Sequence, residues 1–118
     1  RQMCIRDSDK LDIVFNEIGS KLPDNVKTVT SGNNWVDIQN NDINKGIAMR
    51  FLQAIYEIEP DECMAFGDQM NDYELLQQVK YSYAMANAVD PIKEIAYDIA
   101  DTNDRQGVLS KIKEVLEL

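Results

Sequence analysis

Apolar positions follow a helical rhythm near the start of the chain and a strand rhythm after it. Apolar residues recur at helical spacing from Leu11 to Leu22, with Ser8 or Asp9 as the expected N-cap and Pro23 as the stop. The stretches "VKTVTS" and "WVDIQ" then predict two short strands, and the intervening "GNN" predicts a tight turn between them. A helix followed by a β-hairpin is therefore expected before residue 43.

The pattern changes in the rest of the chain, where predicted helices alternate with predicted strands. A helix is predicted in "NDINKGIAMRFLQAIYEI", with Asn44 as its cap, and the continuous apolar run "CMAF" is typical of a strand buried on both faces. The stretches "NDYELLQQV", "YSYAMA", "DPIKEIA" and "YDIA" continue the alternation up to a final helix. This order indicates a parallel sheet with helices on its faces, as in half of a doubly wound α/β domain. The apolar stripes of the first and last of these helices are Ile47, Phe51, Leu52 and Ile55, and Val108, Leu109, Ile112, Val115 and Leu116.

Charge and composition narrow the possible functions. The 118 residues carry a net charge of −9 and include no histidine. An acidic chain is a poor nucleic-acid binder, because phosphate backbones attract clustered lysine and arginine. The absence of histidine excludes Ser-His and Cys-His nucleophile pairs and His-ligated zinc.

The chain also lacks the marks of a membrane or secreted protein. No apolar run approaches the length that spans a bilayer, and the start "RQMCIRDS" has no signal-peptide stretch. Cys4 and Cys63 are too few and too differently placed for a disulfide framework. We therefore expect a cytoplasmic protein with no nucleic-acid or membrane partner.

Two carboxylates stand close together where the buried strand "CMAF" ends. Asp68 follows that strand directly, and Asp72 lies in the first turn of the next helix. In open α/β sheets ligands bind beyond the carboxyl ends of the strands, and paired carboxylates are stabilised by a hard cation such as Mg²⁺. Structural roles compete with this interpretation, because an acid in a first helical turn is favoured by the helix dipole and Asn71 suits an N-cap.

Lys45 is a second candidate site residue. It falls at the start of a predicted helix, where the helix dipole disfavours a cation but attracts an anion. Lys45 and the neighbouring Gly46 would form a compact pocket of the size of a phosphate group. In isolation "NKG" fits an ordinary solvated lysine better, so the functional interpretation depends on the downstream "GDQMND".

The ordered set of motifs resembles a known family. "NKG" followed by "GDQMND", and then "AMANAVDPIKEIA" and "TNDRQGV", resemble the haloacid dehalogenase (HAD) superfamily, in particular its Cof-type sugar-phosphatase branch. The resemblance implies a partial HAD-like Rossmannoid fold, a doubly wound parallel sheet, preceded by the end of an α/β cap domain. Residues 43–118 would be the C-terminal part of the core, 9–42 the C-terminal part of the cap, and 1–8 a non-native or disordered leader.

The resemblance also implies roles for individual residues. Asp68 would bind Mg²⁺, and Lys45 would neutralise the transferring phosphoryl group and the nucleophile. Asn71 would donate a hydrogen bond to a phosphate oxygen, and Asn87 would line the site. Asp72 would orient Lys45 or the water shell of the metal, which makes it both a catalytic and a metal-site candidate.

The family's nucleophile motif, DxDGT, is not found in these residues. Asp7 and Asp9 in "RDSDKLD" lack the preceding apolar strand and the following Gly-Thr. We therefore expect the C-terminal fragment of a Mg²⁺-dependent phosphatase for small phosphorylated metabolites, inactive in isolation. The alternatives are a complete, non-catalytic Mg²⁺-binding or partner-binding α/β module and, with less support, an acidic-pocket receiver domain. Sugar, nucleotide, flavin and pyridoxal phosphates all remain possible substrates, and a partial sheet would leave an unpaired edge for self-association.

Overall fold

The computed structural model describes residues 3–5, 11–30 and 36–118. The chain divides into two compact units, Arg1–Asn44 and Lys45–Leu118. From the sequence, we expected the boundary between the cap and the core after residue 42.

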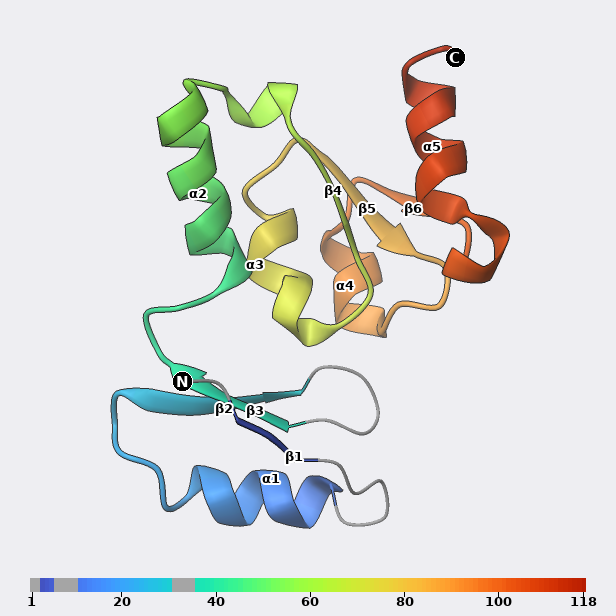
Figure 1. The fold of residues 1–118 in the computed structure, drawn as a ribbon. Coiled ribbons are helices and arrows are strands. Elements are labelled where there is room, and N and C mark those ends of the chain that lie inside the picture. Colours follow the sequence, from blue (N-terminus) through green and yellow to red (C-terminus); the bar gives the residue numbers. More distant parts are fainter. Residues whose placement is uncertain (1–2, 6–10, 31–35) are drawn as a thin grey trace. The chain divides into compact units, whose positions relative to one another are not determined.

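The first unit combines one helix with a three-stranded antiparallel sheet of order β1-β3-β2 (Figure 1). The predicted hairpin is confirmed, since Val26 pairs with Asn40 and Thr30 with Val36. Its turn, and the expected caps Ser8 and Asp9, lie outside the described residues. The elements are β1 (Met3–Ile5), α1 (Leu11–Gly19), β2 (Val26–Thr30) and β3 (Val36–Asn40).

Strand β1 differs from the leader expected for residues 1–8. Met3–Ile5 pairs antiparallel with β3, so that Cys4 stands opposite Asp37. The pairing satisfies backbone groups on the side of β3 that faces away from β2. Three apolar residues are too short to give a periodic signal, which is why the sequence did not predict this strand.

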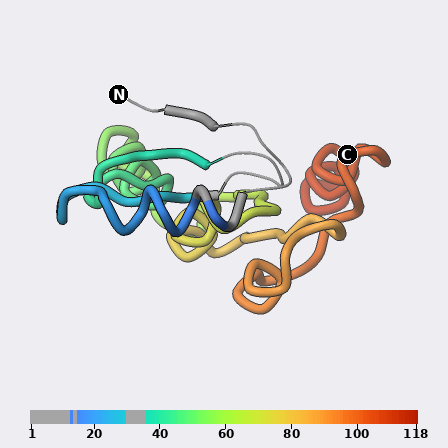
Figure 2. The backbone as a smooth tube through the Cα atoms, turned by 90° about the horizontal axis from the view of Figure 1, so that it is seen from below, coloured from blue at the N-terminus to red at the C-terminus, as the bar shows by residue number. Residues whose placement is uncertain are grey.

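The second unit is a parallel three-stranded sheet of order β4-β5-β6 with helices around it. Figure 2 shows α4 and α5 on opposite sides of this sheet. The predicted α/β alternation is confirmed, and the architecture is a partial Rossmannoid fold. The main elements are α2 (Lys45–Tyr56), β4 (Met64–Gly67), α3 (Tyr73–Leu76), β5 (Tyr81–Met85), α4 (Asp90–Ile95), β6 (Asp98–Ala100) and α5 (Gly107–Val115).

The core of the second unit is centred on β5. Ala84 of this strand is fully buried, and so are Leu76 of α3 and Ile92 of α4. The ring of Tyr83, the residue before Ala84 in β5, stacks on the ring of Phe66 in β4. The two ring centroids are 5.3 Å apart. Burial on both faces agrees with the continuous apolar runs of these strands, as expected for a parallel sheet.

Helix α2 packs against this core with its less apolar side. Gly46 is buried and Met49 packs against the core cluster, whereas Phe51 is 67% exposed and Ile55 56% exposed. The side-chain amide of Gln53 donates a hydrogen bond of 2.8 Å to the Gln78 carbonyl, which fixes the helix in this orientation. The predicted apolar stripe therefore lies on the outer side of the helix in this unit.

Within the described part of the chain, no helix is both long and apolar enough to cross a bilayer.

Candidate active site

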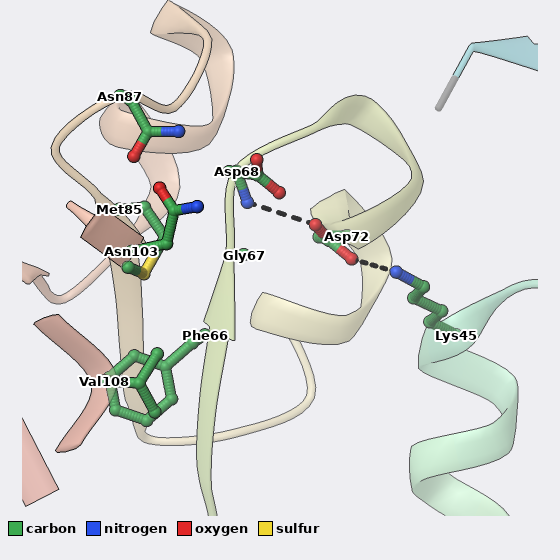
Figure 3. Close-up of a pocket in the computed structure, with 9 residues that line it drawn as sticks. All are labelled: Lys45, Phe66, Gly67, Asp68, Asp72, Met85, Asn87, Asn103 and Val108. Carbon is green, nitrogen blue, oxygen red and sulfur yellow. Dashed lines mark hydrogen bonds and ion pairs between the residues drawn. The ribbon is translucent and has the colours of Figure 1, made fainter. Parts of the chain in front are cut away.

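Polar side chains gather at the carboxyl ends of the three parallel strands. Asp68 directly follows β4, Asn87 lies just after β5, and Asn103 follows β6 in a short 3₁₀ helix, η3 (Asn103–Arg105). Together with Lys45 and Asp72, these residues line a pocket of about 360 Å³, which Figure 3 shows in close-up. Parallel strands deliver their carboxyl ends to one edge of the sheet, so residues distant in sequence meet there.

The pocket floor and walls come from the same strand ends and their connections. Backbone contacts hold two of these connections together, because the Val89 amide donates a hydrogen bond of 3.0 Å to the Asp68 carbonyl. The apolar part of the lining is supplied by Phe66, Met85 and Val108.

The carboxylate of Asp72 organises the loop that follows β4. Its Oδ2 accepts hydrogen bonds from the backbone amides of Asp68, at 3.1 Å, and Gln69, at 3.3 Å. Only 5% of Asp72 is exposed. A Cβ atom on Gly67 would lie 2.6 Å from the Asp72 Cβ, so the close approach of the carboxylate requires glycine at that position.

Lys45 reaches the same carboxylate from the first position of α2. Its ammonium group forms an ion pair with Asp72 Oδ1 (Figure 3). The Lys45 side chain is 50% exposed and that of Asp72 only 7%, so the cation keeps contact with solvent while the carboxylate is buried. Gly46 allows this arrangement, because a Cβ there would lie 2.5 Å from the Glu74 carbonyl oxygen of α3.

The carboxylate of Asp68, in contrast, forms no hydrogen bond or ion pair within residues 3–5, 11–30 and 36–118. It is partly exposed and lines the pocket (Figure 3). No group of three or more His, Cys, Asp or Glu side chains gathers around a point in the same residues. One carboxylate with amide oxygens nearby suits Mg²⁺, which is bound through one or two carboxylates and keeps several waters. This donor set fits the ion, and Asp68 is the residue that would hold it.

The five residues singled out from the sequence do not all line the pocket. Lys45, Asp68, Asp72 and Asn87 do. Asn71 is not among the lining residues, and its buried Oδ1 has no hydrogen-bond partner in the described structure. An unsatisfied buried acceptor is uncommon in proteins and marks a position where a donor is missing.

The sequence interpretation assigned no role to Asn103, although it included the stretch "TNDRQGV". The loop that carries Asn103 is tightly folded. Gln106 has a left-handed backbone (φ 56°), and a Cβ on Gly107 would lie 1.9 Å from the Asp101 carbonyl oxygen. This glycine in an otherwise polar loop was the available signal for a constrained backbone.

A second charged cluster lies on the α5 side of the sheet. The Lys111 ammonium lies 5.5 Å from the centre of the Tyr83 ring and forms ion pairs with Asp98, at 3.3 Å, and Glu114, at 3.1 Å. Burial raises the pKa of the Tyr83 phenol above its ordinary value, and the hydrogen bond to Glu114 raises the pKa of Lys111. The backbone amide of Ile99, followed by Lys111, lowers the pKa of Asp98.

Comparison with known proteins gives a consistent result. Residues 2–112 match the family of haloacid dehalogenase-like hydrolases. The chain is 36% identical to the 5-amino-6-(5-phospho-D-ribitylamino)uracil phosphatase YbjI of Escherichia coli, over 92% of this chain and 46% of that protein. The phosphatase of the same name from Bacillus subtilis, YitU, is 31% identical over 70% of this chain and 31% of its own length.

Solved structures resemble the chain over almost its whole length. A crystal structure from Streptococcus mutans UA159 has a TM-score of 0.85 and 32% identity, and the match covers 99% of this chain and 45% of that one. A HAD/COF-like hydrolase from Plasmodium vivax, at 24% identity, shares the fold with a TM-score of 0.91. The chain thus spans less than half the length of these proteins, and it belongs to the haloacid dehalogenase-like hydrolase family.

Proposed function

We propose that the pocket is the Mg²⁺ and phosphate half of a phosphomonoesterase active site. This proposal rests on the different environments of two carboxylates, those of Asp68 and Asp72, which lie 4 positions apart in the sequence. Asp72 is bound by Lys45 and two backbone amides, while Asp68 remains available to a ligand. Phosphoryl transfer depends mainly on positioning and charge neutralisation, which a lysine and an uncommitted carboxylate can provide.

Each residue has a separate task in this proposal. Asp68 binds Mg²⁺, which neutralises negative charge on the phosphoryl group. The Lys45 ammonium attracts a phosphate oxygen on its exposed side, and Asp72 holds that ammonium in place. Asn71 would donate a hydrogen bond from its Nδ2 to a phosphate oxygen, while its buried Oδ1, an acceptor without a partner in the described residues, leaves room for a further donor. Asn87 and Asn103 offer neutral hydrogen-bonding groups at the opposite side of the pocket.

The proposed substrates are small phosphorylated metabolites such as sugar or polyol phosphates. Support comes from two relatives that are named as phosphatases of 5-amino-6-(5-phospho-D-ribitylamino)uracil, a phosphorylated polyol derivative. The neutral amides of Asn87 and Asn103 suit the hydroxyl groups of such a molecule. The proposed location is the cytoplasm, since the Cys63 thiol is free and buried.

The second candidate function is non-catalytic binding of Mg²⁺ or of a partner. It is favoured by the absence of a DxDGT motif from these 118 residues, because the pocket then has a cation site without a nucleophile. Under this alternative the same residues would bind the ion, but no turnover would follow.

The metal part of the proposal is tested by Mg²⁺ titration of the chain. Chemical shifts of the backbone amides around the pocket would be followed by NMR in wild type, Asp68→Ala and Asp61→Ala. Asp61 is an exposed carboxylate in η1 (Pro60–Glu62), outside the pocket lining, and serves as the matched control. We expect Asp68→Ala to weaken binding by about tenfold or more and Asp61→Ala to leave it unchanged. Equal affinities for all three proteins would contradict the proposal.

A further inference from the structure

One residue from each parallel strand contributes to a row of side chains across the sheet. Phe66 of β4 is paired with Tyr83 of β5, and Tyr83 is paired with Asp98 of β6. Paired residues of neighbouring strands project to the same face of a sheet, so these three side chains share one face. We call them the cross-strand row. Because Phe66 stacks on Tyr83 and also lines the pocket, the row connects the pocket wall with β6.

Lys111 of α5 contacts two members of this row. Its ammonium lies 5.5 Å from the centre of the Tyr83 ring, within the range of a cation–π interaction, and 3.3 Å from the Asp98 carboxylate. Glu114 of the same helix binds it at 3.1 Å. The Lys111 side chain is only 12% exposed, and lysine is rarely so buried unless it is paired. Isolated surface ion pairs stabilise little, but an ammonium with three partners holds α5 at a defined place on the sheet.

The start of α5 belongs to the pocket. Val108, which lies one helical turn before Lys111, lines the pocket, and so does Asn103 in the 3₁₀ helix that precedes α5. The two segments are tightly joined, because the Gly107 amide donates a hydrogen bond of 3.0 Å to the Thr102 carbonyl. Figure 3 shows Asn103 and Val108 on the side of the pocket away from α2. A displacement of α5 would therefore move this side of the pocket.

The two sides of the pocket are fixed by different contacts. The metal side is fixed by Asp72, which binds Lys45 and two backbone amides of the loop after β4. None of these contacts involves α5. We propose that Lys111 is a positioning residue, which sets the place of Asn103 in the pocket through its contacts with the cross-strand row. This inference rests on the proposed function, in which Asn103 faces the hydroxyl groups of a phosphorylated substrate.

The test uses the complete 118-residue chain without ligand and follows the side-chain amide signals of Asn103 by NMR. Lys111→Met removes the charge but keeps an unbranched side chain. The matched control is Lys113→Met, which makes the same change at an exposed lysine of the same helix. Lys111→Arg keeps a cation that can lie over an aromatic ring, so it should retain the signals of the wild type.

Asp98→Asn tests the same contact from the side of the sheet. It weakens the attachment of Lys111 without changing α5, so this test does not depend on whether Lys111→Met folds. Circular dichroism verifies that each variant is folded.

We expect Lys111→Met and Asp98→Asn to shift the Asn103 amide signals and to increase the motion of this side chain. The backbone amide signals of Gly67 and Asp68, on the metal side, should stay unchanged. The proposal is overturned if neither variant changes the Asn103 signals, or if Lys113→Met changes them equally. It is also overturned if Gly67 and Asp68 respond as strongly, since Lys111 would then stabilise the whole unit rather than position one side of the pocket.

Ligand binding provides a second readout. The probe is sorbitol 6-phosphate in the presence of Mg²⁺, titrated by calorimetry. We expect Lys111→Met to weaken its binding by about threefold or more and to leave the affinity for Mg²⁺ unchanged. Equal affinities of wild type and Lys111→Met for sorbitol 6-phosphate would overturn the proposal. Since the Asn103 signals are recorded without ligand, a failure of this positioning role is distinct from a failure of the metal site, which the Asp68→Ala titration detects.

Discussion

The backbone amide of Asp68 donates a hydrogen bond of 3.1 Å to the carboxylate of Asp72. The two acidic residues of this loop therefore have unequal environments. Asp72 is a buried acceptor that shapes the loop and holds Lys45, whereas the Asp68 side chain is left facing the pocket. This relationship predicts that the same substitution changes the stability of the protein differently at the two positions.

Asp72→Asn should destabilise the second unit, while Asp68→Asn should not. Replacing Asp72 removes the charge that binds Lys45 and weakens the acceptor of two backbone amides, which we expect to cost about 1–3 kcal/mol. Asp68→Asn should stay within about 0.5 kcal/mol of wild type, because its side chain is partly exposed. Urea unfolding followed by circular dichroism measures both values. Equal destabilisation by the two substitutions would show that the assigned roles are wrong.

Gly46→Ala should be destabilising even though alanine favours helices. The new Cβ would lie 2.5 Å from the Glu74 carbonyl oxygen, a backbone atom that cannot move without shifting α3. Overpacking of this kind costs about 1–3 kcal/mol. Gly19→Ala at the end of α1 is the comparison, since its Cβ would approach only the Thr28 hydroxyl, at 3.3 Å rather than 2.5 Å. Thermal unfolding of both variants tests the difference, and a Gly46→Ala protein as stable as wild type would contradict it.

The stability of the chain should decrease at alkaline pH, in part because of Tyr83. Burial raises the pKa of this phenol above the ordinary value of 10.0. As the pH rises past this value, the unfolded chain releases the proton first and the folded chain retains it, so the free energy of unfolding falls. The raised pKa of Lys111 acts in the same direction, because its contribution is complete below the unfolded pKa and is lost as the pH rises.

Tyr83→Phe isolates the contribution of the phenol. Denaturant unfolding between pH 8 and about 10.5 should give a smaller decrease in the free energy of unfolding for Tyr83→Phe than for wild type. The comparison concerns the slopes with pH rather than the absolute stabilities, since the substitution also alters packing. Parallel slopes would exclude a role for Tyr83 in the alkaline transition.

The isolated chain should not hydrolyse p-nitrophenyl phosphate at a measurable rate. The 118 residues lack a DxDGT nucleophile motif, and the groups that remain stabilise a reaction that cannot begin. The assay compares wild type with Asp68→Ala in the presence of Mg²⁺, so that turnover by a contaminating phosphatase appears equally in both. Turnover that depends on Mg²⁺ and disappears in Asp68→Ala would contradict this expectation.

Local sequence patterns were sufficient to predict the parallel α/β architecture and the strand-end position of Asp68. Each depends on residues close in sequence, such as the apolar run "CMAF" followed by Gly67 and Asp68. The pairing of Lys45 with Asp72 was one of two options considered for Asp72, and the ion pair is present. Its role in catalysis stays a prediction.

Other features depend on distant contacts that no local pattern contains. The stripe of α2 showed that one side of the helix is apolar, but periodicity does not identify what covers that side, and Phe51 is exposed. The sequence did not predict strand β1, because the strand is identified by its pairing with β3 and its own three residues form no periodic pattern. The place of Asn103 at the pocket depends on the fold of the loop that ends at Gly107.

The order of the parallel strands has a consequence for how the second unit is made. Along the sheet, β4, β5 and β6 follow the same order as in the chain, so each crossover joins neighbouring strands. A sheet of this kind can grow by one strand at a time as the polypeptide leaves the ribosome, with short loop closures at every step. Each new strand of this sheet would then find the strand with which it pairs already synthesised.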